Sequence, residues 1–396
     1  MTTKNILITG GQTNNNGAQA MIFITVDEIA KRFPDCTPIV LVNHMAAVPD
    51  SGQYRFRTVK TPPFKKRLPL MNRFLYRLFR RSFKDPALVS YTEMLENCEA
   101  LIDISGYEFG ANWGSSSGFG YLTRVMTAKT FGIPVYLFPQ SFGPFPFTGI
   151  KGTAVNLLAR HYLPYCKVIM AREEQGKTAL EKQYRLKNVV LCDDMVLQNT
   201  VIDKASVFKE IPPSRQIQIA PASVAVIPNQ KNTRYCPTDR MAAAYGNVVR
   251  MLLSRGRTVY LVYHSTEDAP ICRRIKELFP EDMRVILIGE KWNCLDFEAL
   301  VPRFDFVIAS RFHSVVHAYR GAVPAVILGW ADKYHALARR MGEEGWQIDI
   351  RDADWETALL GKTEEMDRSF ARESRTISDH LQIVRKNNCF DYLGEK

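Results

Sequence analysis

The stretch "FDFVIASRFHSVVHAYRGAVPAVILG" (304–329) joins two short apolar runs through a segment with helical spacing. The runs are "FDFVIAS" (304–310) and "AVILG" (325–329). Continuous apolar runs separated by a helix are typical of parallel strands that are covered on both faces. The stretch therefore predicts a strand–helix–strand unit, and its helix begins with an Arg and a His.

The same alternation extends along most of the chain. In the first half, helical spacing separates most of the apolar runs at 5–10, 38–43, 100–105, 134–140, 167–171 and 188–192. The intervening helices are expected at 18–32, 87–97, 119–131, 149–161 and 173–183. This order predicts an α/β fold with a parallel sheet.

A polar segment with two prolines, 203–214, interrupts this rhythm and predicts a linker. Further strands are expected at 216–221, 258–264, 284–289, 304–310, 325–329 and 346–350, and C-terminal helices at 355–388. We therefore expect two Rossmann-like domains, an N-terminal one at 1–205 and a C-terminal one at 206–396. Ligands of such sheets bind at the carboxyl ends of the strands, which places the site in the cleft between the domains.

Bulk composition is that of a globular protein, with 46% hydrophobic and 23% charged residues among 396. The sequence starts directly with a strand pattern, without a signal peptide, and no uncharged apolar run is long enough to span a bilayer. The eight cysteines have no metal-binding spacing and are expected to be reduced core thiols. These features predict a cytoplasmic protein.

Positive charge is concentrated in one segment, 55–84, which has eleven Lys and Arg and no Asp or Glu. Those eleven charges equal the net charge of the whole chain, +11. As a helix, 68–84 would have an apolar face beside a basic face, which suits an anionic membrane surface or a lipid diphosphate head group. The alternative is an ordinary helix that packs its apolar face on the sheet. No recognition motif accompanies the charges, so nucleic acid is not expected.

Two loops that follow strands of the first half have residues suited to binding sugars. The first, "GGQTNNNGA" (10–18), includes Asn14, Asn16 and Gly17, whose backbone suits an anion or sugar hydroxyls. An ordinary turn with an Asn helix cap is equally compatible. The second loop, 105–119, offers an aromatic surface beside amide and carboxylate groups from Tyr107, Glu108, Asn112 and Trp113.

Three further strand ends carry polar side chains, which are Gln140, Arg172 and the pair Asp193 and Asp194. Gln140 lies at the end of an apolar run, where it either faces the cleft or belongs to a rigid connector. Arg172 follows the next run and is either a ligand anchor or half of an ion pair with Asp193 or Asp194.

The helix start within the opening stretch is the strongest candidate for an anion site. Ser310 is expected to cap a helix whose first turn has Arg311 and His313. Free N–H groups and the helix dipole already favour an anion there, so a cation at this end calls for an anionic ligand. Lys333 follows the next strand, and the three side chains would converge on one small anion. His317 shares a face with His313, but no carboxylate or HExxH pattern supports a metal.

With these motifs, the chain resembles the polysaccharide pyruvyl transferase family. The shared features are "TNNNGAQAM", the Gly-rich loop after "DIS", "PQSFGPF", "AREEQG" and, most specifically, "SRFHSVVHAYRGAVPAVILGWADK". The resemblance implies a GT-B-like fold and transfer of a pyruvyl group from phosphoenolpyruvate to two hydroxyls of a sugar, giving a cyclic ketal and phosphate. It also implies that Arg311 and His313 contact phosphoenolpyruvate, with Arg172 and Lys333 as partners.

The resemblance has one departure, because many members have Gly-Asp where this chain has Gly17 and Ala18. Arg and Lys suit a donor with a carboxylate and a phosphate, and a His can act as acid and then as base near neutral pH. Phosphoenolpyruvate is a co-substrate, and no metal or other cofactor is expected. The acceptor would be a polysaccharide or a lipid-diphosphate-linked glycan at the inner face of the membrane. The alternatives are a GT-B glycosyltransferase that uses a nucleotide sugar and a noncatalytic glycan-binding protein.

Overall fold

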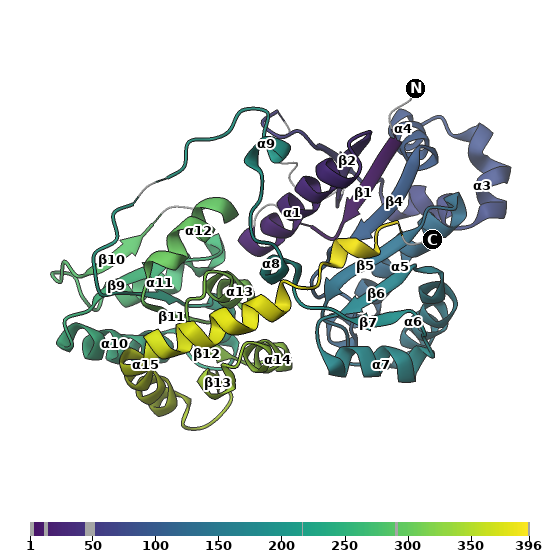
Figure 1. The fold of residues 1–396 in the computed structure, drawn as a ribbon. Coiled ribbons are helices and arrows are strands. Elements are labelled where there is room, and N and C mark those ends of the chain that lie inside the picture. The colour runs from purple at the N-terminus through teal and green to yellow at the C-terminus, as the bar shows by residue number, and fades with distance from the viewer. Residues whose placement is uncertain (1–3, 12–14, 44–51, 216, 290–291, 395–396) are drawn as a thin grey trace.

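The computed structural model describes residues 4–11, 15–43, 52–215, 217–289 and 292–394. Two parallel sheets, each between layers of helices, form two α/β domains that lie side by side (Figure 1). The predicted fold class, two Rossmann-like domains with parallel sheets, is confirmed.

The N-terminal sheet has the order β3-β2-β1-β4-β5-β6-β7 in the described part of the chain. Its strands are β1 (Lys4–Thr9), β2 (Cys36–Val42), β3 (Arg57–Lys60), β4 (Cys98–Asp103), β5 (Val135–Gln140), β6 (Val168–Ala171) and β7 (Val189–Leu191). The helices are α1 (Asn16–Arg32), α2 (Phe64–Arg67), α3 (Arg73–Phe79), α4 (Pro86–Glu96), α5 (Gly114–Phe131), α6 (Gly149–Tyr162), α7 (Glu174–Tyr184), α8 (Met195–Gln198) and α9 (Lys204–Val207). Among these strands, only the short edge strand β3 was not predicted, and the short helices α2, α8 and α9 were not predicted either.

The C-terminal sheet has the order β10-β9-β8-β11-β12-β13. Its strands are β8 (Ser223–Ile227), β9 (Thr258–Val262), β10 (Val285–Ile288), β11 (Phe306–Ala309), β12 (Ala325–Gly329) and β13 (Gln347–Asp349). The helices are α10 (Thr238–Ser254), α11 (Ala269–Lys276), α12 (Cys294–Leu300), α13 (Phe312–Arg320), α14 (Asp332–Arg340) and α15 (Trp355–Val384). Short 3-10 turns complete the chain: η1 (Leu68–Met71), η2 (Arg80–Ser82), η3 (Ala111–Trp113), η4 (Leu163–Tyr165), η5 (Gln230–Arg234), η6 (Thr266–Asp268), η7 (Val301–Arg303), η8 (Glu344–Trp346) and η9 (Cys389–Tyr392).

One apolar core continues from one domain into the other. It contains Ile22 and Ile24 of α1, Val196 of α8 and Val315 and Val316 of α13, all buried. A separate core fills the other face of each sheet. The shared core fixes α1 against α13, and these helices carry the predicted acceptor loop and the predicted donor residues.

The strand expected at 216–221 is wrong by several residues, because β8 begins at Ser223. β8 lies between β9 and β11, and a central strand of this kind is buried on both faces. "SVAVI" is buried throughout, whereas the described residues of 217–222 are partly or fully exposed. The central strand is therefore the continuously apolar run, not the run in which apolar and polar residues alternate.

The connections between the domains are more extensive than a single linker. The expected linker contains α9, and Phe208 then forms an antiparallel bridge with Tyr54. At the other end of the chain, α15 runs along the C-terminal domain, and η9 returns to the N-terminal domain (Figure 1). There the rings of Phe390 and Phe138 lie 4.8 Å apart.

The predicted continuous helix at 68–84 is wrong, because the segment divides into η1, α3 and η2. Asn72 causes the break, since it is extended and its side chain accepts hydrogen bonds from the N–H groups of Phe74 and Leu75. The alternative in which the apolar face packs on the sheet is also wrong. Four of its apolar residues are exposed: Phe74, Leu75, Leu78 and Phe79.

The eight cysteines are all free thiols and six of them are buried, as expected. Across the residues that the structure describes, no helix is both long and apolar enough to cross a bilayer.

Candidate active site

The start of α13 differs in detail from the prediction. Ser310 does not cap the helix, because its hydroxyl lies 2.7 Å from the hydroxyl of Tyr245 in the core. Arg311 occupies the N-cap position without a side-chain cap, and the helix begins at Phe312. The first N–H groups of α13 are therefore not capped by a side chain.

Arg311 is held inside the C-terminal domain by carboxylates. Its Nε lies 2.8 Å from Asp268 Oδ2, and its Nη2 lies 2.7 Å from Asp268 Oδ1 and 3.1 Å from Glu267. Asp268 is completely buried. The two-bond pair fixes the end of β11 to the loop after β9, so a donor anion would have to share Arg311 with these carboxylates.

His313 lies against the start of α1 from the other domain. A Cβ atom added to Gly17 would lie only 2.1 Å from Cγ of His313. The side chain of Asn15 caps α1 by accepting hydrogen bonds from the N–H groups of Gly17 and Ala18, which confirms the predicted Asn cap. Gly17 thus allows the first turns of α1 and α13 to meet. Asn16 is buried at this junction, whereas Asn14 lies outside the described residues.

Two cations approach the same turn. Lys333 Nζ lies 4.8 Å from the ring centre of Phe312 and 5.1 Å from that of Tyr107. Arg172 Cζ lies 4.7 Å from the ring centre of Phe312. The structure therefore brings Arg172, Lys333, His313 and the Tyr107 loop together.

Arg172 also forms the ion pair that was predicted as an alternative. Its Nη1 lies 2.5 Å from Asp194 Oδ2, and its Nη2 donates to the carbonyl of Gly106 and to Ser141 Oγ. Its Nε is buried and has no hydrogen-bond partner in the described structure. Arg172 thus joins several strand ends while one N–H group remains unsatisfied.

Electrostatics at this turn favour an anion. Burial, together with the charges of Arg172 and Lys333, lowers the pKa of His313 to about 3. Burial and the charge of Arg172 lower the pKa of Lys333 to about 7. Burial is the larger cause for both groups, and the neighbouring positive charges add to it. A bound anion would raise both pKa values.

The predicted acceptor loop forms a cluster beside Lys333. The rings of Tyr107 and Trp113 meet edge to face at 5.3 Å, and Asn112 Nδ2 donates to the Tyr107 hydroxyl at 3.0 Å. Trp113 is 47% exposed, so its ring can stack on a ligand. Glu108 is held differently, because both of its carboxylate oxygens lie 2.8 Å from Nη2 of Arg124.

Gln140 does not line the cleft, so that expectation is wrong. Its side chain is fully buried and bonds within the domain to Asp103, Phe138 and Tyr121. β5 is flanked on both sides by strands, so the amide at its end lies beneath the loops.

Sequence reasoning missed Arg124 and His264 near the site and considered His317 only as a metal ligand. Arg124 of α5 bonds Asp103, Ser105 and Glu108, and a helical Arg far from any strand end gives no local signal. His264 and His317 are 3% and 2% exposed, with ring centres 5.8 Å apart and no hydrogen-bond partner for any ring nitrogen in the described structure. Burial lowers the pKa of both imidazoles. His264 follows β9, so its strand-end position was the signal available.

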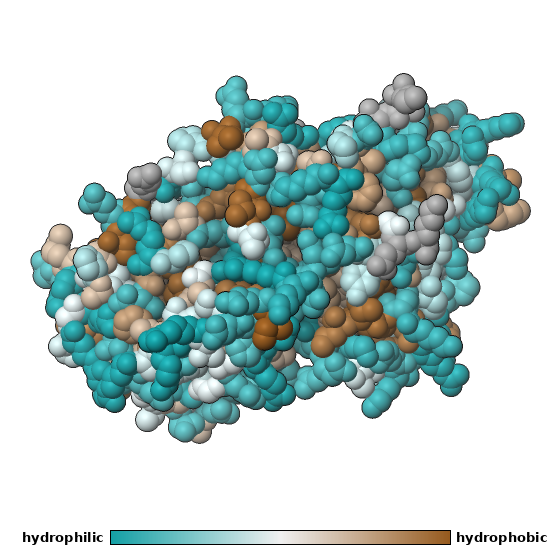
Figure 2. Space-filling view, viewed as in Figure 1, coloured by the Kyte–Doolittle hydropathy of each residue, from teal (hydrophilic) through white to brown (hydrophobic). Residues whose placement is uncertain are grey.

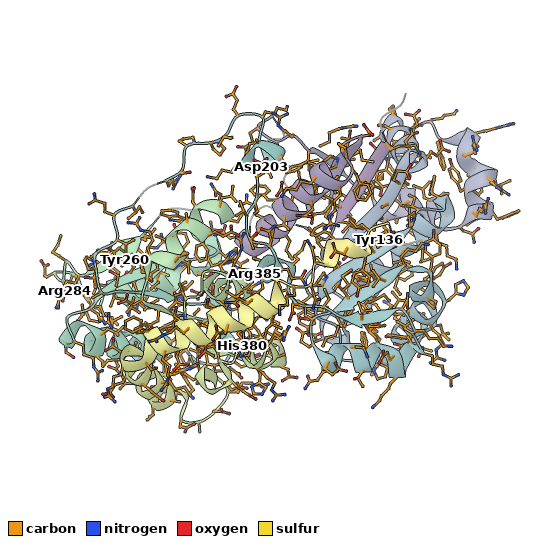
Figure 3. The ribbon with its side chains drawn as sticks, viewed as in Figure 1. Tyr136, Asp203, Tyr260, Arg284, His380 and Arg385 are labelled. Carbon is orange, nitrogen blue, oxygen red and sulfur yellow. The ribbon has the colours of Figure 1, made fainter. Side chains whose placement is uncertain are left out.

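The described residues include no group of three or more His, Cys, Asp or Glu side chains placed to hold a metal ion. A cavity of about 1300 Å³ lies between the domains and has Arg172, Glu173 and Asp332 in its wall. It extends toward Tyr392 and the His380 side chain of α15, which Figure 3 labels. Arg172 lines this cavity, whereas His313, Lys333 and Trp113 are not among its wall residues, so the cavity adjoins the site on the side of Arg172.

Solved structures show the same architecture. HepE from Anabaena, in complex with UDP and glucose, is 11% identical with a TM-score of 0.55 over 98% of this chain and 97% of that chain. A glycosyltransferase from Rickettsia africae is 11% identical with a TM-score of 0.54 over the whole of both chains. At this identity the likeness defines the fold alone. No curated protein sequence matches the chain significantly.

Fold and site together define a two-domain protein of the GT-B type, with a cationic site at the junction of its domains. The family model for polysaccharide pyruvyl transferase matches residues 15–332. The chain therefore belongs to the polysaccharide pyruvyl transferase family, and the resemblance seen in its motifs is confirmed. The family implies an enzyme that transfers pyruvyl groups to polysaccharide. The match contains His313 and Arg172 and ends one residue before Lys333.

Proposed function

We propose that the protein transfers the pyruvyl group of phosphoenolpyruvate to two hydroxyls of one sugar, forming a cyclic ketal and releasing phosphate. The observation that carries this proposal is the approach of Arg172 and Lys333 to the start of α13, beside His313. Phosphoenolpyruvate has a carboxylate and a phosphate, and both need cationic or N–H partners. Arg311, a third cation behind this turn, is already paired with Asp268 and Glu267, so it would contribute N–H donors rather than net positive charge.

His313 is proposed as the acid and base. The anionic donor raises the pKa of His313, so that the imidazolium can protonate the methylene carbon of the donor. Positive charge then develops at the central carbon, and the first sugar hydroxyl attacks it while its proton passes to His313. The C–O bond to phosphate breaks, the second hydroxyl attacks the same carbon, and its proton leaves with the phosphate. One hydroxyl proton thus replaces the proton given to the methyl group.

Many members of the family have an Asp where this chain has Ala18, and its absence agrees with the role proposed for His313. α1 has no acidic residue in its first turn, so that turn offers no carboxylate base to the acceptor. His313 lies directly against Gly17 at the same place. A single imidazole at the junction can therefore reach the donor and the acceptor.

The acceptor is proposed to lie against the loop of Tyr107, Asn112 and Trp113, with the sugar ring stacked on Trp113. It would be a unit of a polysaccharide or of a lipid-diphosphate-linked precursor at the inner face of the membrane. Trp113→Ala should raise the acceptor KM and leave phosphoenolpyruvate binding unchanged. An acceptor bound on an outer face of either domain would contradict this placement.

The experiment combines phosphate release with mass spectrometry of candidate glycans after incubation with phosphoenolpyruvate. The proposal requires a pyruvate ketal on the glycan and one phosphate for each ketal. Sugar transfer from a nucleotide sugar without ketal formation would instead support a glycosyltransferase. Glycan binding without any product would support a noncatalytic protein. Either result would overturn the proposal.

A further inference from the structure

The segment from α2 to η2 (residues 64–84), here called the basic surface, exposes large apolar side chains. Phe74 is 72% exposed and Leu78 is 58% exposed. Phe64, Leu68, Leu75 and Phe79 are exposed as well. α3 lies on the part of the N-terminal domain that is distant from the other domain, and apolar residues are visible at this edge of the molecule in Figure 2. Such a concentration of exposed apolar residues marks an interaction surface.

Positive charge surrounds these apolar side chains. The exposed cations of the basic surface are Lys65, Lys66, Arg73, Arg77, Arg80, Arg81 and Lys84. The segment itself has no acidic residue, and Asp85, just beyond it, pairs with Lys66. The basic surface has eight positive charges, against a net charge of +11 for the whole chain, so the field of the protein is strongest here.

The packing of the basic surface on its domain keeps these apolar side chains exposed. Tyr76 is buried beneath α3, where its ring lies 4.7 Å from that of Phe131 and its hydroxyl donates to Glu96. Leu70 and Met71 of η1 are buried too. These residues hold one side of the segment on the domain, so the other side must face outward.

We propose that the basic surface binds an anionic lipid bilayer, with Phe74 and Leu78 inserted among the acyl chains and the Arg and Lys side chains at the lipid phosphates. Apolar side chains ringed by cations match the chemical layers of a bilayer interface. Nucleic acid would use the cations but leave the aliphatic Leu78 in water. This inference goes beyond pyruvyl transfer and does not depend on it. It would place the domain with the acceptor loop next to membrane-bound glycans.

Cosedimentation of the full chain with vesicles tests the proposal. Vesicles of phosphatidylcholine alone are compared with vesicles that also contain phosphatidylglycerol, each at low and high salt. We expect binding to the anionic vesicles at low salt and weaker binding as salt screens the charges. Arg77→Gln with Arg81→Gln should lower the partition coefficient roughly thirtyfold, from about 1 kcal/mol per charge.

The apolar part is tested separately. Phe74→Ser with Leu78→Ser should lower binding by about tenfold or more, because two buried apolar side chains are lost. The matched controls are Met283→Ser, exposed in the C-terminal domain, and Lys182→Gln with Lys187→Gln on the N-terminal domain. These controls should bind as the unaltered chain does, and thermal unfolding should be the same for all variants.

A direct readout of insertion is available from Phe74→Trp. Its added fluorescence should shift to the blue with anionic vesicles and be quenched by brominated acyl chains. Absent or equal binding to both vesicle types at low salt would overturn the proposal. It would also be overturned if the basic surface bound single-stranded DNA but no vesicle, or if it mediated self-association that Phe74→Ser with Leu78→Ser abolishes.

Discussion

Lys333 can gain or lose its charge within the ordinary pH range because it is buried near the charge of Arg172. Its pKa is lowered to about 7, so the free protein loses this ammonium group as the pH rises above that value. A bound dianion favours the charged form, so binding above pH 7 must take up a proton. We expect the affinity for phosphoenolpyruvate to fall by up to tenfold for each pH unit above about 7.

The measurement is calorimetric titration of phosphoenolpyruvate at several pH values. Lys333→Arg keeps a permanent charge and should make the affinity nearly independent of pH in this range. Affinity that stays constant up to about pH 9 in the unaltered chain would show that Lys333 does not meet the donor.

A substitution at Gly17 tests whether the contact between α1 and α13 positions His313 for the reaction. Gly17→Ala should push His313 aside, because the new Cβ would lie 2.1 Å from its Cγ. A shift on the scale of 1 Å in a reacting group costs about a hundredfold in rate, so kcat should fall by that order. Gly361→Ala, where the new Cβ meets no atom within 4 Å, should leave kcat unchanged. Equal kcat in both variants would separate His313 from the chemistry.

A substitution of His264 tests whether this buried side chain serves the reaction or only the packing of the core. Its ring lies 5.1 Å from that of Phe297, so His264→Phe should fit an apolar site and keep or raise the melting temperature. We expect turnover to fall at least tenfold at the same time, because the buried imidazole is close enough to His313 and Arg311 to interact with them electrostatically. Unchanged turnover with a raised melting temperature would make His264 a packing residue.

Arg124 shows how one helix stabilises the acceptor loop. α5 places its guanidinium 2.8 Å from Asp103, which is buried, and 2.8 Å from the partly exposed Glu108. Arg124→Met would leave Asp103 without its charge partner and should lower the free energy of unfolding by about 3 kcal/mol. Urea denaturation measures this loss, which should be much smaller when Asp103 is already Asn. A loss that is the same in both backgrounds would contradict the pairing.

At the scale of elements, apolar runs predict the strands and helices well, since burial on both faces leaves a direct pattern in the sequence. β8 was misplaced because "QIQIAP" alternates although "SVAVI" is the buried run. The break between η1 and α3 depends on the side chain of one residue, Asn72, in a segment with helical spacing throughout.

The candidate site was only partly predictable from the sequence. Strand-end positions indicated His313, Arg172 and Lys333, which the structure does bring together. The same rule did not indicate that Asp268 holds Arg311 or that Gln140 is buried, because both depend on partners far away in the chain.

At the scale of the molecule, η9 holds the domains together. Phe390 is 2% exposed against the N-terminal sheet, so Phe390→Ala should lower the free energy of unfolding by about 3 kcal/mol through the cavity that it creates. Losing this contact should also loosen the junction and increase the radius of gyration measured by small-angle scattering. Ile383→Ala on exposed α15 surface is the control and should change neither value. An unchanged radius for Phe390→Ala would show that η9 does not restrain the domains.

The path of α15 has a consequence for synthesis on the ribosome. Arg385, labelled in Figure 3, donates to the carbonyl of Arg320 at 2.9 Å as the chain leaves the C-terminal domain. η9 then covers Phe138, which belongs to a strand made some 250 residues earlier. Most of the N-terminal domain is therefore translated well before η9 can cover Phe138, and a nascent chain that still lacks η9 leaves this part of the sheet exposed. A chaperone that binds nascent chains would find its target on this surface, and premature termination anywhere in α15 would leave it permanently uncovered.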